Sequence, residues 1–458
     1  MGAARRVVVT GLGIVSSIGS DPARFWGNCL EGQSRISPIP EHWRSYANLH
    51  SSIWSTLDPI DAEGMGLTRV EVAQNDPVSL IAGNAARQAL TDAGLEIELV
   101  NKRANASRIV DVDSQRVGVY MGTGVGGTSS LLDNFTVQIL SRQRPKLEEV
   151  LQGLPEDGEA RDTTASVLEA LHQGRRFNPF IVSMLMPNAV PAHIGLKYSI
   201  KGPNLSYCVA CASGTVAIGK AFQAIREGSV DIAISGGSEY LDDHYGGVFH
   251  GFDIAKALVR DCDDPESANR PFDVNRSGFL FSQGGAAVLL LEDLESALAR
   301  GAPILAEVAG YAETFDAYSV MSIAPDGTQI ERMMQSALDD AGLARSDIHY
   351  VNAHGTGTQA NDVVETEVIG RVFGRDVLVN STKSLIGHTI GASGAIEALV
   401  TVMTLKEQRT HLCKNLQEPL TDLNFVRETT SAAMDAGLTQ SFAFGGHNAG
   451  LIFKRFEQ

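Results

Sequence analysis

Short apolar runs alternate with helical patterns and glycine-rich turns along almost the whole chain. Runs such as "RRVVVTGLG", "RVGVYMGTG" and "AAVLLLED" have the length of strands, and apolar residues recur at helical spacing near 78–93, 215–227, 328–341, 360–372 and 394–407. Nearly continuous apolar strands between helices indicate a sheet covered by helices on both faces. The pattern therefore predicts an α/β fold.

A similar segment opens each half of the chain. A strand that runs into glycine occurs at Val7–Gly13 and again at Ile304–Gly310, and further helices and strands follow both. This recurrence suggests an internal duplication. A polar, charge-rich stretch from about 141 to 173 interrupts the first half, and it predicts an insertion on the surface.

Charge and cysteine content exclude several classes of protein. The net charge of −17 and the lack of long Lys/Arg runs argue against binding to nucleic acid. The five cysteines have no paired spacing, which argues against a disulfide framework. We see no apolar run long enough for a signal peptide or a membrane span. These features predict a cytoplasmic protein that does not insert into membranes.

One glycine turn invites comparison with nucleotide sites. "GTGVGG" at Gly122–Gly127 follows a strand and has the spacing of a dinucleotide-binding turn. Such a site also needs an acidic residue at the end of a second strand, about twenty positions further on. Glu148 and Glu149 fall in a polar stretch without strand character. We therefore expect these glycines to serve a tight turn.

The segment "CVACASG" (Cys208–Gly214) places two cysteines three positions apart. A structural zinc site needs a second Cys/His pair, and a redox pair would begin a helix in a small domain, so neither fits well. The apolar residues after Cys211 have the spacing of a helix that ends at Gly228. Cys211 is therefore predicted to lie at a helix N-terminus, where the dipole favours a thiolate nucleophile. Cys208 is expected to be a packing residue.

Two histidines lie in polar, glycine-rich segments that follow predicted strands. They are His354 in "NAHGTGT" and His388 in "STKSLIGHTIGASG", and Lys383 lies five residues before His388. A nucleophilic cysteine needs proton-transfer partners. Because α/β folds place their sites at such strand ends, these residues are candidates for that role.

With these residues in view, the chain resembles the β-ketoacyl-acyl-carrier-protein synthases, most closely the synthase II type. The matching segments are "ACASG", "NAHGTGT", "NSTKSLIGH" and "SFAFGGHN", and weaker matches extend over nearly the whole chain. The resemblance implies a thiolase-like fold, with two similar halves stacked as α-β-α-β-α layers, each with a mixed five-stranded sheet. The halves would span 1–297 and 298–458, with the polar insertion in the first.

The resemblance also implies a reaction and a set of roles. The enzyme would condense an acyl group held on Cys211 with malonyl-acyl-carrier protein, with loss of carbon dioxide. His354 and His388 would assist that loss by donating hydrogen bonds to the enolate. The other implied residues are Lys383 with its acidic partner Glu365, the gating Phe444 whose backbone N–H completes an oxyanion hole, the substrate-binding Thr356, Thr358, Val125 and Phe252, and the carrier-docking Arg175, Arg176 and Lys256.

The implied partners are an acyl carrier protein and a second subunit. The second subunit would be another copy of the chain or a chain-length factor. The resemblance implies no metal and no cofactor beyond the phosphopantetheine that carries the substrates. For any one docking cation, ordinary solvated surface charge is an equally good interpretation.

Some positions depart from the common family pattern and leave the acyl substrate open. They are Val209, Gln283, Ala443 and His447, together with the insertion. Fatty-acid elongation and polyketide or polyene assembly both fit. Two further functions stay open: a non-catalytic chain-length factor, which would lack the nucleophile, and a thiolase-like enzyme, which would need a second cysteine near the C-terminus.

Overall fold

A mixed sheet of ten strands runs through the molecule. The computed structural model describes residues 4–170, 177–260 and 264–457. The strands lie in the order β12-β11-β15-β16-β10-β1-β9-β8-β6-β7. Their bounds are β1 Val7–Val15, β6 Val117–Gly122, β7 Asn204–Tyr207, β8 Ile232–Tyr240, β9 Gly284–Asp293, β10 Ala306–Phe315, β11 Tyr350–Asn352, β12 Leu378–Asn380, β15 Ala436–Ala443 and β16 His447–Lys454.

The sheet consists of two sets of five strands with the same pairing. In the first set, β9 pairs antiparallel with β1 and β8, and β6 pairs parallel with β8 and β7. In the second set, β10, β16, β15, β11 and β12 repeat this arrangement. The two sets meet where β1 pairs with β10. The predicted duplication of Val7–Gly13 and Ile304–Gly310 thus forms the two equivalent central strands.

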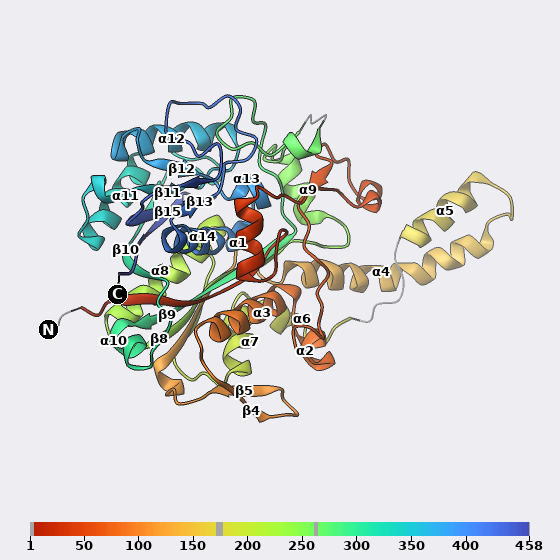
Figure 1. Cartoon of the computed structure of the whole chain (residues 1–458). Helices are drawn as coiled ribbons and strands as arrows, with labels where there is room; N and C mark the ends of the chain where they lie inside the picture. The colour runs from red at the N-terminus through yellow and green to blue at the C-terminus, as the bar shows by residue number, and fades with distance from the viewer. Residues whose placement is uncertain (1–3, 171–176, 261–263, 458) are drawn as a thin grey trace.

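Helices form three layers around these strands (Figure 1). The helices α3 (Pro77–Asp92) and α7 (Ala189–Lys197) cover the outer face of the first set, and α11 (Thr328–Ala341) and α12 (Gln359–Phe373) cover that of the second. Between them lie α8 (Ser213–Arg226) and α14 (Ser393–Glu407). Apolar cores fill all three levels. The predicted α-β-α-β-α stack is confirmed.

The two central helices approach closely at their N-terminal ends. A Cβ atom added at Gly214 would lie 2.7 Å from the backbone nitrogen of Ala395, and one at Gly394 would lie 2.0 Å from Oγ1 of Thr215. Because glycine alone leaves room here, these residues let the two helix starts pack against each other. The turns that precede the helices carry Cys211 and His388, so this contact brings the two functional segments together.

Several short helices and strands lie around this stack. No helix in the described ranges is long and apolar enough to cross a membrane. The short helices are α1 Pro22–Leu30, α2 Arg69–Gln74, α6 Ile181–Leu185, α9 Gly247–Ile254, α10 Leu294–Ala299 and α13 Lys383–Ile386, and the short strands are β2 Ser37–Pro38, β3 Ile53–Trp54, β4 Ile97–Asn101, β5 Ala106–Ile109, β13 Arg409–Thr410 and β14 Thr430–Ser431.

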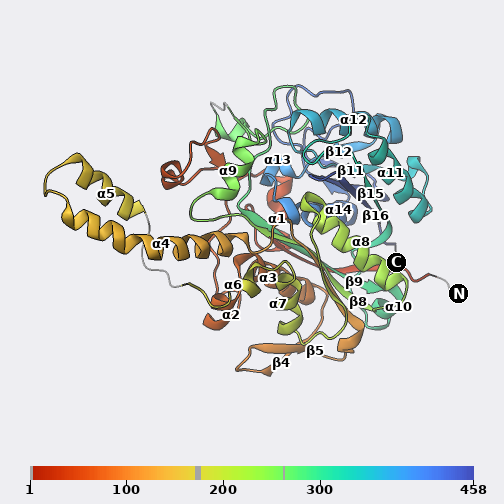
Figure 2. The ribbon, with the colours of Figure 1, turned by 180° about the vertical axis from the view of Figure 1, so that it is seen from behind.

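The predicted insertion forms a helical arm. Helix α4 (Thr128–Gly153) leaves the body and α5 (Glu159–Ala170) folds back along it, so that the pair projects away from the sheet (Figure 1 and Figure 2). Residues 171–173 of the insertion lie outside the described residues. The arm begins earlier than the polar stretch because α4 starts in the body, in the turn after β6.

The turn "GTGVGG" holds a buried carboxylate. The backbone N–H groups of Gly124 and Val125 donate to the side chain of Glu239, at 2.6 and 3.3 Å, and the hydroxyl of Thr123 donates at 3.1 Å. The N–H of Gly391, just before α14, donates to the same carboxylate at 3.0 Å. The glycine turn therefore ties the first half of the chain to the segment after His388, as a structural turn.

Candidate active site

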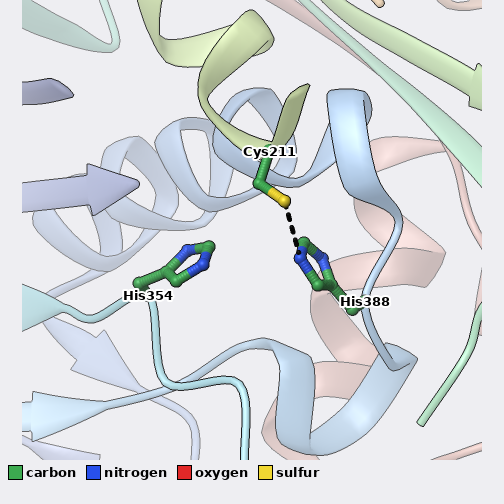
Figure 3. Close-up of side chains that lie close together, drawn as sticks. All are labelled: Cys211, His354 and His388. Atoms are coloured by element: carbon green, nitrogen blue, oxygen red, sulfur yellow. Dashed lines mark hydrogen bonds between the residues drawn. The ribbon is translucent and has the colours of Figure 1, made fainter. Parts of the chain in front are cut away.

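Cys211 lies in a turn that leads into the central helix α8. A short 3-10 turn over Ala210–Ala212 precedes Ser213, the first residue of α8, and the helix ends at Arg226. The predicted position at a helix N-terminus is therefore correct. Ala210 has a left-handed backbone, with φ of 48°, which turns the chain sharply before the cysteine. The Cys211 side chain is 5% exposed and points toward His354 and His388 (Figure 3).

The expected thiolate at Cys211 needs a correction. Burial raises the pKa of the Cys211 thiol to about 12. The charge of Lys383 and the backbone N–H groups of Phe444 and Cys211 lower this pKa, but their effect is smaller than that of burial. The helix N-terminus does not overcome the loss of solvation in this apolar setting. The resting group is therefore a thiol. The same two N–H groups interact with the thiol, so both lie beside the sulfur.

His388 is held as a neutral imidazole that carries its proton on Nε2. The backbone N–H of Ile390 donates to Nδ1 at 3.2 Å, and the Ser393 hydroxyl lies 2.9 Å from the same nitrogen. A backbone N–H can only donate, so Nδ1 accepts and the proton resides on Nε2. Nε2 lies 3.1 Å from Sγ of Cys211. Burial, and then the charge of Lys383, hold the pKa of His388 well below its usual range.

His354 reaches the same tautomer through a different support. The ammonium group of Lys383 lies 3.2 Å from Nδ1 of His354 and 2.7 Å from its backbone oxygen. An ammonium group has no lone pair, so Nδ1 accepts and Nε2 again carries the proton. Burial and the Lys383 charge hold the pKa of His354 well below its usual range. The two imidazole rings stand nearly perpendicular, with centroids 5.5 Å apart.

The acidic partner of Lys383 is Glu397, and the expectation that Glu365 fills this place is wrong. Lys383 is 1% exposed, and its third proton goes to Oε1 of Glu397 in a short ion pair. Glu397 lies inside the apolar helix α14, which runs behind the catalytic cavity. A buried ammonium needs such a charge nearby, and Glu397 on α14 supplies it.

Glu365 instead fixes the backbone of the loop that carries His354. Its two oxygens accept from the N–H groups of His354 at 2.7 Å and Gly355 at 2.8 Å. The side chain of Gln440 donates at 2.7 Å from the neighbouring strand β15. Burial, and then the charge of Asp362, raise the pKa of Glu365 to about 7. Glu365 therefore acts on His354 through the main chain.

A cavity of about 410 Å³ opens from these residues to the surface. Cys211, His354 and His388 lie along it with Thr356, Thr358 and Phe444. The hydroxyls of Thr356 and Thr358 lie 2.9 Å apart, so they present a paired polar edge on the cavity wall. Lys256 also lines the cavity, and it is exposed with a left-handed φ of 59°.

The other predicted residues lie at the edge of this site or outside the described residues. Phe252 stacks on Phe444 with ring centroids 6.3 Å apart, and it is not part of the cavity wall. Val125 lies in the turn that holds Glu239 and is 38% exposed. Arg175 and Arg176 lie outside the described residues.

The positions that depart from the family pattern surround the site. Val209 donates its N–H to Ser213 at 2.9 Å, and Ala443 lines the cavity beside Phe444. The ring of His447 packs on Phe315 at 5.1 Å. Gln283 accepts from the N–H of Leu57 at 2.8 Å, which ties the loop after β3 to the loop before β9. Ala443 is the departure in contact with the cavity.

The two imidazoles and the thiol face a common point. One ring nitrogen of each histidine and Sγ of Cys211 lie within 4.8 Å of one another. Three such donors have the number and type that a zinc ion binds. The Nδ1 hydrogen bonds, however, leave N–H protons and not lone pairs toward this point, and the Lys383 charge lies behind His354. The arrangement therefore suits an anionic oxygen better than a cation.

Two residues of this site escaped the sequence analysis. Glu397 is a lone acid in the apolar run "GAIEALV", and such a residue needs a buried cationic partner, so this signal was available. Ser393 supports His388 and follows it by five residues in a segment rich in small residues, where nothing in the sequence distinguishes it.

Comparison with known proteins places this arrangement in a family. The β-ketoacyl synthase N-terminal domain matches residues 4–296, and the C-terminal domain matches 305–417. The 3-oxoacyl-[acyl-carrier-protein] synthase 2 of Synechocystis is 36% identical over 99% of both chains, and that of Staphylococcus aureus N315 is 35% identical over the same share.

Solved structures of ketosynthases share the fold of this chain. A type II polyketide ketosynthase in complex with its acyl carrier protein superposes with a TM-score of 0.81 at 26% identity, covering 99% of this chain and 100% of that one. The ishigamide ketosynthase/chain length factor gives 0.79 at 29% identity, with the same coverage. Sequence, fold and site thus agree, and the chain belongs to the β-ketoacyl synthase family.

Proposed function

We propose that the protein is an acyltransferase that catalyses decarboxylative Claisen condensation. It joins an acyl group held on Cys211 to malonyl-acyl-carrier protein and releases 3-oxoacyl-acyl-carrier protein, carbon dioxide and free carrier protein. The observation that carries the proposal is the convergence of two neutral Nε2–H donors on a cysteine that lies beside two backbone N–H groups. The names of the relatives support the same reaction.

The first step is transfer of the acyl group. Sγ of Cys211 attacks the thioester carbon of the acyl-carrier substrate, and the N–H groups of Cys211 and Phe444 stabilise the resulting oxyanion. Collapse of this intermediate expels the carrier thiolate, which takes up the proton that the cysteine loses. Because the resting group is a thiol with a raised pKa, it loses its proton only as Sγ bonds to the thioester carbon, and the departing carrier sulfur takes up that proton. The Lys383 charge and the Nε2–H of His388 stabilise the negative charge that develops on Sγ.

The second step uses the two histidines. The malonyl thioester oxygen lies between the two Nε2–H groups, and the carboxylate leaves as carbon dioxide. The electron pair of the broken C–C bond moves onto that oxygen, so that an enolate forms. The enolate carbon then attacks the acyl carbon on Cys211. Collapse of the second tetrahedral intermediate expels the Cys211 thiolate and leaves the new C–C bond in the product. The thiolate then takes a proton from solvent, which restores the resting thiol.

Lys383 organises the histidine side of the site. Its three protons go to the His354 ring, the His354 backbone oxygen and Glu397. In this position it fixes the tautomer of His354 and disfavours protonation of both imidazoles. Glu365 is a positioning residue in this scheme, and Thr356 and Thr358 line the path of the phosphopantetheine arm. No cofactor beyond that arm is part of the proposal.

We further propose that Val125 and Phe252 shape the acyl site and that the carrier protein docks at the cavity mouth. Phe252 packs on Phe444, so movement of one ring would displace the other. Lys256 lies at the mouth and is exposed, which suits an acidic carrier. Arg175 and Arg176 keep their proposed docking role from the sequence.

Charge reversal tests the docking proposal. Lys256→Glu should raise the KM for the carrier substrate at low salt, and the difference should shrink at high salt. Lys102→Glu is the matched control, because Lys102 is exposed in the hairpin of β4 and β5, on the opposite side of the body (Figure 1). Equal KM values for the two variants at low salt would place docking elsewhere.

We propose that the chain forms a homodimer through the β7 edge. β7 ends the sheet, and exposed apolar residues lie along it and on the adjacent helices: Leu205 on β7, Val182 on α6 and Leu196 on α7. An open strand edge beside an apolar surface favours pairing with another chain. A chain-length factor is the alternative occupant. Native mass spectrometry of the purified chain separates a homodimer from a chain that needs a different partner.

The remaining proposals concern organisation, compartment and rival functions. The halves 1–297 and 298–458 are proposed as the two domains. A reducing, cytoplasmic setting is supported by the free cysteines Cys29, Cys208, Cys211 and Cys413.

The presence of Cys211 disfavours a chain-length factor. Cys413 is buried, does not line the cavity and accordingly gives no support to a thiolase-like reaction.

Intact-protein mass spectrometry tests the reaction. After incubation with a panel of acyl-carrier proteins, the protein should gain the mass of an acyl group. Malonyl-carrier protein should then remove this adduct and release carbon dioxide. The preferred acyl group would distinguish fatty-acid elongation from polyketide or polyene assembly. If no member of the panel gives an adduct, the non-catalytic function becomes the better one.

A further inference from the structure

A buried asparagine lies between the two carboxylates that support the His354 loop. Asn361 is in the first turn of α12, is 9% exposed and forms part of the cavity wall. The next residue is Asp362, and Glu365 follows one helical turn later. Both carboxylates are fully buried. Asn361 therefore lies between the cavity and the two carboxylates that support the His354 loop.

The two carboxylates hold successive parts of the same loop. Glu365 accepts from the N–H groups of His354 and Gly355. Asp362 accepts from the N–H of Gly357 at 3.2 Å, and from that of Phe272 at 2.8 Å. The backbone from His354 to Gly357 thus depends on both acids in their ionised form, since a carboxylate accepts at both oxygens.

These two buried negative charges repel each other. The charge of Asp362 contributes to the raised pKa of Glu365. The charged groups around Glu365 are Asp362 on its own helix, Glu397 on α14, and Lys383, which Glu397 partly neutralises. Arg276 lies 3.5 Å from Asp362 on the far side. Within the described residues, the groups that donate to Glu365 are uncharged amides, so each of them matters for keeping it ionised.

The side-chain amide of Asn361 connects the two acids. Its Nδ2 donates to Oδ1 of Asp362 at 3.1 Å and to Oε2 of Glu365 at 3.1 Å. We propose that Asn361 is a positioning residue that keeps His354 aligned by bridging Asp362 and Glu365. The proposal rests on the proposed function, because it assigns Asn361 to the decarboxylation half of that reaction.

The bridge predicts a specific pH effect. Loss of the amide removes a donor from the ionised Glu365, so its pKa rises and it becomes protonated at a higher pH. A protonated Glu365 holds the N–H groups of His354 and Gly355 less firmly. Decarboxylation should then fail at a higher pH on the acid side, while attack by Cys211 on the acyl substrate should continue.

The experiment compares Asn361→Ala and the isosteric Asn361→Asp with the wild type and with Asn48→Asp, an exposed asparagine. Carbon dioxide release from malonyl-carrier protein is measured between about pH 6 and pH 9, and acylation is measured by intact mass. At the acid end, loss of one hydrogen bond to a carboxylate should slow decarboxylation about tenfold or more. Asn361→Asp should shift the acid limb furthest, because it adds a third negative charge.

The two kinds of failure are distinguishable. If the wild type forms no acyl adduct or releases no carbon dioxide, the proposed function fails. If the wild type works and the variants lose rate equally at every pH, or lose acylation and decarboxylation together, Asn361 is only structural and the inference is overturned. Thermal unfolding of both variants checks that they fold, and the Asp variant preserves the shape of the side chain.

Discussion

The two sides of the cavity each present a histidine Nε2–H group, but different contacts hold the two rings in place. On one side, a backbone N–H and the Ser393 hydroxyl orient His388, and all of these groups lie between His388 and the first residue of α14. On the other side, the Lys383 ammonium orients His354, and its charge is balanced by Glu397 on another helix. The His388 side is therefore local and uncharged, whereas the His354 side depends on a buried ion pair assembled over a long range of sequence.

This contrast predicts unequal sensitivity. A buried ion pair fails badly when one partner is removed, because the remaining charge is left without compensation. A pair of uncharged hydrogen bonds loses one member at modest cost. The substitutions below test these expectations in order of decreasing effect.

Cys211→Ala removes the group that both sides serve, and it should abolish acyl transfer. Cys208→Ala should retain it, because Cys208 is exposed and its Sγ lies 3.2 Å from the backbone oxygen of Gly124, outside the cavity wall. Intact-mass analysis after incubation with an acyl-carrier substrate measures both. An acyl adduct that maps to Cys208 would refute the assignment.

Lys383→Ala should impair the His354 side most. We expect decarboxylation to fall by about 10³-fold, since His354 loses its orientation together with the nearby charge. Stability should fall by about 3–5 kcal/mol, because Glu397 stays buried without its partner. Carbon dioxide release and denaturant unfolding are the measurements, with Lys406→Ala at the exposed end of α14 as the control. Wild-type stability in Lys383→Ala would contradict the ion-pair account.

His388→Ala and His354→Ala should each slow decarboxylation by about 10²–10³-fold, the usual cost of one oxyanion-type donor. They should differ in acylation. His388→Ala should still form the acyl-enzyme, but more slowly than His354→Ala does, because only the His388 Nε2 lies within hydrogen-bond distance of Sγ in the described contacts. If His388→Ala abolished acylation and left decarboxylation near the wild-type rate, the two roles would be reversed.

Ser393→Ala should have the smallest effect. The N–H of Ile390 still holds Nδ1 of His388, so the tautomer persists after the hydroxyl is lost. One neutral hydrogen bond is worth about 1 kcal/mol, which corresponds to about a fivefold loss of rate. Steady-state kinetics with malonyl-carrier protein measures it. A loss as large as that of His388→Ala would mean that the serine, and not the backbone, fixes the ring.

The sequence predicted a sheet covered by helices and the position of Cys211 at a helix start, because both follow from local patterns. The strand-to-glycine segments at Val7–Gly13 and Ile304–Gly310 became the central pair of strands, and the helical spacing after Cys211 became α8. The family resemblance added the paired halves, and the comparisons confirm that family. Periodicity and turn chemistry depend on residues that are close in the sequence, so they can be predicted from the sequence alone.

Electrostatic details depended on distances that no local pattern contains. The family resemblance suggested Glu365 as the partner of Lys383, yet the fold places Glu397 there, and Glu365 holds the His354 backbone. The helix N-terminus suggested a thiolate at Cys211, yet burial dominates its pKa. In both cases the correction comes from the dense packing of the central layer, which a linear pattern does not report.

His354 and His388 are both neutral and carry their proton on Nε2, according to the contacts of their Nδ1 atoms. Nitrogen-15 NMR of histidine-labelled protein measures this directly, with the two rings assigned by difference from His354→Gln and His388→Gln. For both rings we expect an unprotonated Nδ1 and a protonated Nε2 from about pH 6 to pH 8. The reason is that burial lowers the pKa of both histidines. A protonated Nδ1 or an imidazolium signal from either ring in that range would contradict it.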